Sequence, residues 1–113
     1  MSSNPSHSGQ AAARASIVGS LALFFPEAVP LRLGVRVAMA TGASEQTVIE
    51  FGTANEVMFA SSLQLEFGDQ LTLSNSDGSL LATAQVVAVQ FHAGEAAVAA
   101  RFSQRVSNWI VRS

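Results

Sequence analysis

Apolar and polar residues alternate along much of the chain between residues 29 and 102. The alternation is clearest over residues 31–39, where every second residue is apolar and Arg32 and Arg36 lie on the opposite parity. A repeat of two residues is typical of a β-strand that has one face in a core and the other in water. The pattern therefore predicts that the regular structure begins with a strand near Val29.

Shorter segments of the same character follow, and each ends near a cluster of Gly, Asp, Asn or Ser. Three such clusters, at residues 67–69, 75–78 and 92–94, begin about 8 and 17 residues apart. Strands that pair with their neighbours in sequence have this spacing. Further strands are expected at residues 47–51, 56–60, 70–74, 80–91 and 95–102. The pattern predicts an all-β domain, a small antiparallel barrel or sandwich.

In two of these segments the pattern must be examined to decide which side chains point toward the core. The segment 80–91 is long for one straight strand, and its apolar residues change parity between Val86 and Val87. An extra residue in a β-bulge would bring both halves onto one face. In the segment 47–51, strict alternation places Ile49 and Phe51 together on one face.

The N-terminal part of the chain lacks this alternation. Residues 1–10 are rich in Ser, Asn and Gly and are expected to form a flexible tail. The apolar run at 17–25 is shorter than the roughly twenty residues that cross a bilayer. We expect a helix or an edge element there, with Leu21, Leu23 and Phe24 packed on the barrel or against a second copy in a homodimer. Arg14 precedes the run, so a cleaved secretory signal stays open as an alternative.

After Phe102 the repeat changes. Val106, Trp109 and Ile110 follow the i, i+3, i+4 spacing of a helix, and Ser103 is a suitable N-cap. A short C-terminal helix is therefore expected, with Trp109 closing one mouth of the barrel. The expected domain division is a tail over residues 1–27 and a barrel domain over residues 28–113.

Composition argues against several classes of function. The chain has 113 residues, six Arg, no Lys, no Cys and a net charge of −2. One compact domain fits this length, and no broad cationic field is present to hold a nucleic acid. Neither His7 nor His92 has a partner at a metal-binding spacing, and no nucleophile has an adjacent base. We expect no metal, no cofactor and no catalysis.

Three segments carry a resemblance to a known family. They are residues 65–73 (Leu-Glu-Phe-Gly-Asp-Gln-Leu-Thr-Leu), 84–89 and 98–102, and together with the strand at 29–37 they resemble a PilZ domain over roughly residues 29–111. The resemblance implies a bacterial cytoplasmic domain with a six-stranded antiparallel β-barrel and a following helix. Many PilZ domains bind cyclic di-GMP, through Arg-x-x-x-Arg before the first strand and Asp/Asn-x-Ser-x-x-Gly after the second.

The chain departs from both of these binding segments. The first falls on residues 24–28, which contain no cation and include Glu27. In the second, Phe51 replaces the acidic or amide residue, Thr53 replaces Ser and Glu56 replaces Gly. A dianionic ligand needs guanidinium donors, and Glu27 and Glu56 are expected to repel it. The resemblance then implies one of the degenerate members, which act as adaptors for motility and secretion machinery through protein–protein contact.

Two alternatives remain. Arg32 and Arg36 form an Arg-x-x-x-Arg sequence within the first strand, and with Thr53 they would make a cyclic di-GMP receptor, to which Arg14 is a further candidate contact. Arginines that alternate with apolar residues more often form a solvated face with cross-strand partners such as Glu50. The second alternative is a small homodimeric barrel with a structural role.

Overall fold

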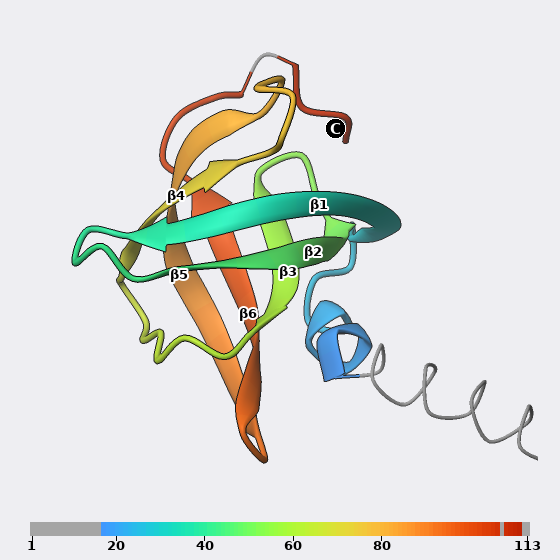
Figure 1. Cartoon of the computed structure of the whole chain (residues 1–113). Helices are drawn as coiled ribbons and strands as arrows, with labels where there is room; N and C mark the ends of the chain where they lie inside the picture. The colour runs from blue at the N-terminus through green and yellow to red at the C-terminus, as the bar shows by residue number, and fades with distance from the viewer. Residues whose placement is uncertain (1–16, 107, 112–113) are drawn as a thin grey trace, which may run out of the picture.

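The chain folds as a closed β-barrel in a computed structural model, which describes residues 17–106 and 108–111. The strands are β1 (Val29–Met39), β2 (Ser44–Gly52), β3 (Glu56–Ser61), β4 (Gln70–Ser74), β5 (Leu81–His92) and β6 (Glu95–Phe102). Their order around the barrel is β1-β2-β3-β6-β5-β4, and every neighbouring pair is antiparallel (Figure 1). The predicted six-stranded antiparallel barrel is confirmed.

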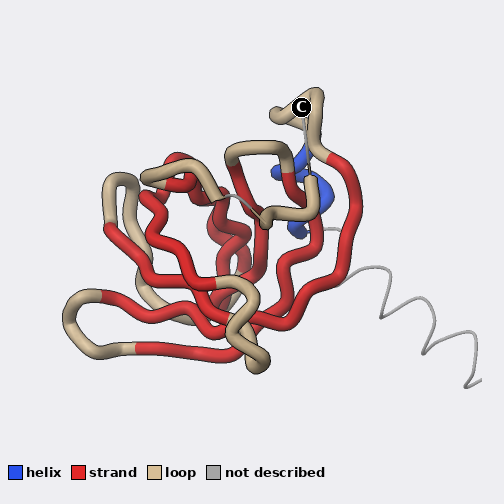
Figure 2. The backbone as a smooth tube through the Cα atoms, turned by 90° about the horizontal axis from the view of Figure 1, so that it is seen from above, coloured by secondary structure: helices blue, strands red, loops and turns tan. Residues whose placement is uncertain are grey.

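The alternation in β1 explains how the barrel closes. Val35 and Val37 point inward and are buried, whereas Arg32 and Arg36 point outward. The second half of β1 pairs with β4, with Val37 opposite Leu73, so the last neighbour in the strand order meets the first. Seen from above, the strands wrap around a common core (Figure 2). That core contains the inward residues Ile49, Val57, Phe59, Leu71, Val86 and Val98.

Three register shifts interrupt the pairing of the strands, one of them between Pro30 and Leu33 of β1, and the other two decide how predicted core residues face. The bulge expected in β5 is present, because the pairing with β6 shifts between Val86 and Ala88. A second shift, between Ile49 and Phe51 in the pairing of β2 with β3, was not foreseen. Ile49 therefore packs in the barrel, while Phe51 joins a separate cluster on the outer surface. The expectation that these two side chains share a face is wrong, because the bulge breaks the period of two.

The predicted C-terminal helix is also wrong within the described residues. Residues 103–106 and 108–111 contain turns and bends, and the backbone N–H of Trp109 bonds only to the carbonyl of Val106. Trp109 is nevertheless buried in the barrel core, and its ring meets that of Phe102 edge-on at a centroid distance of 5.2 Å. The expected closure of the barrel by Trp109 is therefore confirmed without a helix.

The short helix of the described chain lies at the other end, over residues 17–22. It packs on the outer surface of the barrel, beside the strands in Figure 1, so residues assigned to the expected tail contact the barrel directly. The flexible tail expected at residues 1–10, and Arg14, lie outside the described residues. No helix in the described part is long and apolar enough to cross a membrane.

Candidate functional site

The outer surface of the barrel carries an apolar strip where β3 and β6 run side by side. Met58 of β3 lies opposite Ala99 of β6, and neither side chain is exposed to water. Val18 and Leu21 of the N-terminal helix pack on this strip. Because the outward residues of β6 beneath the helix, Ala97 and Ala99, are small, the helix can approach the sheet closely. The strip and the helix form a second hydrophobic cluster outside the barrel core.

The chain leaves this helix through a turn that exposes two large apolar side chains. The N–H groups of Phe24 and Phe25 bond to the carbonyls of Leu21 and Ala22, at 3.0 and 2.9 Å. Phe25 returns to the outer cluster, but Leu23 is 83% exposed and Phe24 is 72% exposed. We call these two residues the Leu23–Phe24 patch. Leu21 is only 2% exposed and packs on its own barrel, which is the first of its two expected places. A homodimer contact through Leu23 and Phe24 stays a prediction.

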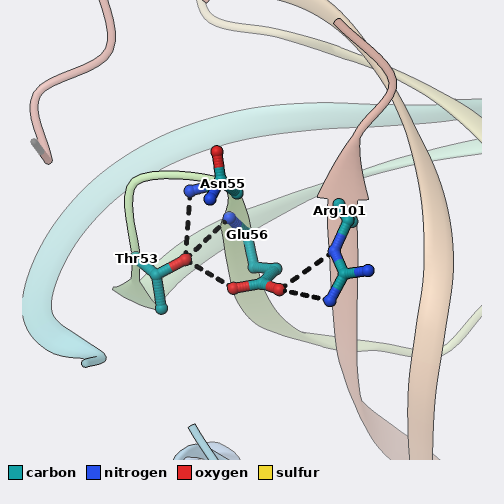
Figure 3. A network of polar contacts seen from close by, with 4 residues as sticks. All are labelled: Thr53, Asn55, Glu56 and Arg101. Carbon is teal, nitrogen blue, oxygen red and sulfur yellow. Dashed lines mark hydrogen bonds and ion pairs between the residues drawn. The ribbon is translucent and has the colours of Figure 1, made fainter. Parts of the chain in front are cut away.

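A polar network lies where β2 passes into β3 (Figure 3). The hydroxyl of Thr53 donates to Glu56 Oε1 at 2.5 Å and accepts the backbone N–H of Asn55 and of Glu56. The other carboxylate oxygen of Glu56 accepts Nε and Nη2 of Arg101, at 3.0 and 2.7 Å. Glu56 is thus held at once by the loop before β3 and by the neighbouring strand β6.

This network changes the interpretation of the second family segment. Thr53, the residue that stands in for the family serine, is 5% exposed, and its hydroxyl is occupied by internal hydrogen bonds. Glu56 was expected to repel an anion, but it is largely buried and its charge is paired with Arg101. The side chain of Arg101 is itself 59% exposed. The cation nearest this segment is therefore one that sequence reasoning did not consider.

The two arginines of β1 lie apart from this network. Arg32 and Arg36 are exposed on the outer face, and Arg36 Nη2 donates to Ser44 Oγ at 3.0 Å. Val29 pairs with Gly52, next to Thr53, whereas Arg36 pairs with Gln46 near the other end of the hairpin. At about 3.3 Å per residue, some 20 Å of strand separates Arg36 from Thr53. The structure does not bring Arg32, Arg36 and Thr53 together as one group.

Sequence reasoning missed Arg101 and the covered face of β6 for different reasons. The Glu56–Arg101 pair depends on the register between β3 and β6, which alternation alone does not fix. The covered face did leave a signal, because the outward positions Ala97 and Ala99 are apolar in a strand with an apolar inner face. A strand that is apolar on both faces is typical of a sheet covered on both sides.

Comparison with known proteins adds no assignment: no protein-family model matches the chain, and no curated protein matches it. Within the residues that the structure describes, no group of three or more His, Asp or Glu side chains is placed to hold a metal ion. The class of the molecule is thus set by the fold of its described residues, a closed six-stranded antiparallel barrel with one short helix.

Proposed function

We propose that this chain is a non-catalytic PilZ-like domain of the bacterial cytoplasm that acts as an adaptor through protein–protein contact. It takes no cofactor and has lost the binding of cyclic di-GMP. The six-stranded antiparallel barrel is the architecture that the sequence resemblance implies.

One observation carries the proposal: an exposed apolar patch lies at the start of residues 24–28, the segment in which PilZ domains place their arginines. Residues 17–25 fold back onto the barrel through Val18, Leu21 and Phe25. The same segment presents Leu23 and Phe24 to solvent. Exposed apolar side chains on a fixed turn favour contact with a protein rather than with a charged nucleotide.

The state of Thr53 and Glu56 also argues against the nucleotide. The Thr53 hydroxyl has one proton, and it would have to withdraw that proton from the Glu56 carboxylate before it donated to a phosphate. Loss of an internal hydrogen bond at a buried site costs about 1–3 kcal/mol of binding free energy.

Isothermal titration calorimetry with cyclic di-GMP tests this part of the proposal. We expect no saturable heat at micromolar protein concentration. The main rival is a receptor that uses Arg32 and Arg36, which flank the open, exposed Gly34 on one face of β1. A micromolar or tighter dissociation constant that is lost in Arg32→Ala or Arg36→Ala would establish the rival and refute our choice.

The adaptor role is tested by affinity capture from the native host with the full chain as bait. The double variant Leu23→Ser/Phe24→Ser is expected to lose the captured partner, and Phe67→Ser, which alters an equally exposed side chain elsewhere, is expected to keep it. Capture of the same partner by all three baits would contradict the role of the patch. Light scattering covers the homodimer alternative: a dimer mass that falls to a monomer in the double variant would assign the patch to a second copy.

A further inference from the structure

A groove runs between the tip of the β5–β6 hairpin and the loop that leaves β3. It has a volume of about 420 Å³. Leu65 and Ala96 line it and are buried, and Leu63 beside them packs on the barrel core. Phe91 also lines the groove but is 77% exposed. We call this depression the Phe91 groove.

The exposure of Phe91 follows from the length of the hairpin. Phe91 lies on the same parity as Val89, which packs on the core, but it is paired with Ala96 near the hairpin tip. In Figure 1 this hairpin projects past the other strands, so the barrel supplies nothing to cover an inward side chain there. An aromatic ring beside an apolar floor is the kind of anchor that contributes most to binding at protein interfaces.

A second depression of about 290 Å³ adjoins the Phe91 groove and shares Ser61, Ser62 and Glu95 with it. It lies between β2 and β3, which pair along Ile49–Gly52 of β2. Glu45 spans the separation: its carboxylate accepts the hydroxyls of Ser61 and Ser62 and the backbone N–H of Ser62. These donors are neutral, so they orient the carboxylate without cancelling its charge.

The charges along the two depressions have one sign. They are carried by the carboxylates Glu45, Glu66 and Glu95, and none of the described residues that line either depression is Arg or Lys. His92 also lines the Phe91 groove. The combined surface is apolar at the Phe91 end and acidic at the Glu45 end. An occupant that matches it carries an apolar side chain followed by basic ones.

We propose that the Phe91 groove and its acidic extension bind a basic peptide segment of the adaptor's partner. An apolar side chain of the segment packs on Phe91 and Leu63, and Arg or Lys side chains pair with Glu66 and Glu95 and then approach Glu45. This inference rests on the proposed adaptor function and names the chemistry of the partner. A second copy of this chain fits less well, because its exposed Leu23–Phe24 patch is followed by Glu27 rather than by a cation.

The test uses a blocked six-residue peptide with one Leu followed by three Arg as the probe. Binding is measured by fluorescence anisotropy, and by chemical-shift changes in the ¹⁵N-labelled full chain. Two matched peptides serve as controls, one with Glu in place of Arg and one with Ser in place of Leu. We expect saturable binding of the first peptide only, weaker at about 0.3 M salt than at about 0.05 M. The shifted amides should fall in residues 45–50, 61–66 and 91–96.

Variants then separate this groove from a general attraction of charges. Phe91→Ala is expected to weaken binding about tenfold, whereas the equally exposed Phe67→Ala leaves it unchanged. Glu66→Gln and Glu95→Gln are each expected to weaken it about threefold and to reduce its dependence on salt. All four changes are at the surface or in the groove wall, and circular dichroism confirms that each variant is folded.

Several outcomes would overturn the inference. These are an absence of saturable binding, equal binding of the Glu-containing peptide, or equal loss in Phe67→Ala and Phe91→Ala. Shifts in the same amides that grow with protein concentration without peptide would assign the groove to a second copy. If the peptide fails while capture still depends on the Leu23–Phe24 patch, the groove is wrong and the adaptor function stands. If capture fails as well, both proposals fail.

Discussion

The indole Nε1 of Trp109 donates a hydrogen bond of 2.7 Å to the carbonyl oxygen of Thr53, a residue 56 positions earlier in the chain. The bond joins the C-terminal segment to the loop between β2 and β3, the loop that also carries the Glu56 network. The plug of the barrel and the start of β3 are therefore fixed to each other.

Replacing Trp109 tests this connection. Trp109→Phe keeps much of the apolar volume but leaves the buried Thr53 carbonyl without its donor, and we expect a loss of about 1–3 kcal/mol. Trp109→Ala adds a cavity in the core, for a loss of about 3–5 kcal/mol. Urea denaturation followed by circular dichroism measures both. An unfolding free energy equal to that of the native chain in both variants would show that the segment is not part of the cooperative unit.

Gly52 and Gly34 form a matched pair of strand glycines. A methyl group at Gly52 would lie 3.1 Å from Trp109 Cζ2, 3.2 Å from Leu31 Cδ2 and 3.3 Å from the carbonyl oxygen of Glu56. One at Gly34 would meet nothing within 4 Å. Gly52→Ala is expected to destabilise the barrel by about 1–3 kcal/mol through overpacking, and Gly34→Ala to be neutral or slightly stabilising. Thermal unfolding of the two variants side by side decides this, and equal melting temperatures would contradict it.

The N-terminal helix should contribute to stability through one leucine and not through the next. Leu21→Ala empties a buried site and is expected to cost about 2–5 kcal/mol. Leu23→Ala changes a side chain that is 83% exposed and should alter stability by no more than about 0.5 kcal/mol. Chemical denaturation measures the difference, and a Leu21→Ala variant as stable as Leu23→Ala would show that the helix adds little to the fold.

The Glu56–Arg101 pair is half-buried, and its effect should lie between those of surface and interior ion pairs. Arg101→Ala leaves a largely buried carboxylate with only the Thr53 hydroxyl and water, and we expect a loss of about 1–2 kcal/mol. When Glu56 has already been replaced by Gln, the further change Arg101→Ala should lower the unfolding free energy by less than Arg101→Ala does in the native chain. Additive losses in a double-mutant cycle would show that the two side chains do not interact in solution.

Asp77 provides a dependence on pH. The backbone N–H of Ser79 donates to Asp77 Oδ1 at 2.9 Å, and this bond, followed by the Ser79 hydroxyl, holds the pKa of Asp77 below its ordinary value. A carboxyl with a lowered folded pKa stabilises the fold above its unfolded pKa and loses that effect as pH falls through the folded value. The stability difference between the native chain and Asp77→Asn should therefore shrink below about pH 4. A difference that is constant down to about pH 2 in urea titrations would contradict this.

The barrel was open to prediction because each strand has an inner face of every second residue and ends at a recognisable turn. Gly68, Gly78 and Gly94 lie in the predicted turn clusters, and all three have positive φ. The side of the sheet on which Phe51 lies could not be predicted from alternation, because the bulge in β2 arises from its pairing with β3. A bulge in one long strand, such as β5, leaves a parity change in the sequence, but one near the end of a short strand leaves none.

The C-terminal error has a similar cause. Val106 and Trp109 do pack on the core, yet Ile110, the third residue of the supposed stripe, is 63% exposed. Three apolar residues at helical spacing fit an irregular segment over a barrel mouth equally well. The Phe91 groove could not be predicted from the sequence, because its walls come from a loop and a hairpin tip that only the closed barrel brings together.

The alanines on the outer face of β6 determine how the protein should behave when its N-terminal helix is removed. Ala97, Ala99 and Met58 have no polar atom in their side chains and are kept from water by residues 17–22. A shortened protein that started at β1 would expose the methyl groups of these alanines and the thioether of Met58. We expect such a protein to aggregate in solution, because this apolar surface would be open to other molecules. The helix over residues 17–22 therefore protects this face of the barrel, and a truncated form of the protein should retain it.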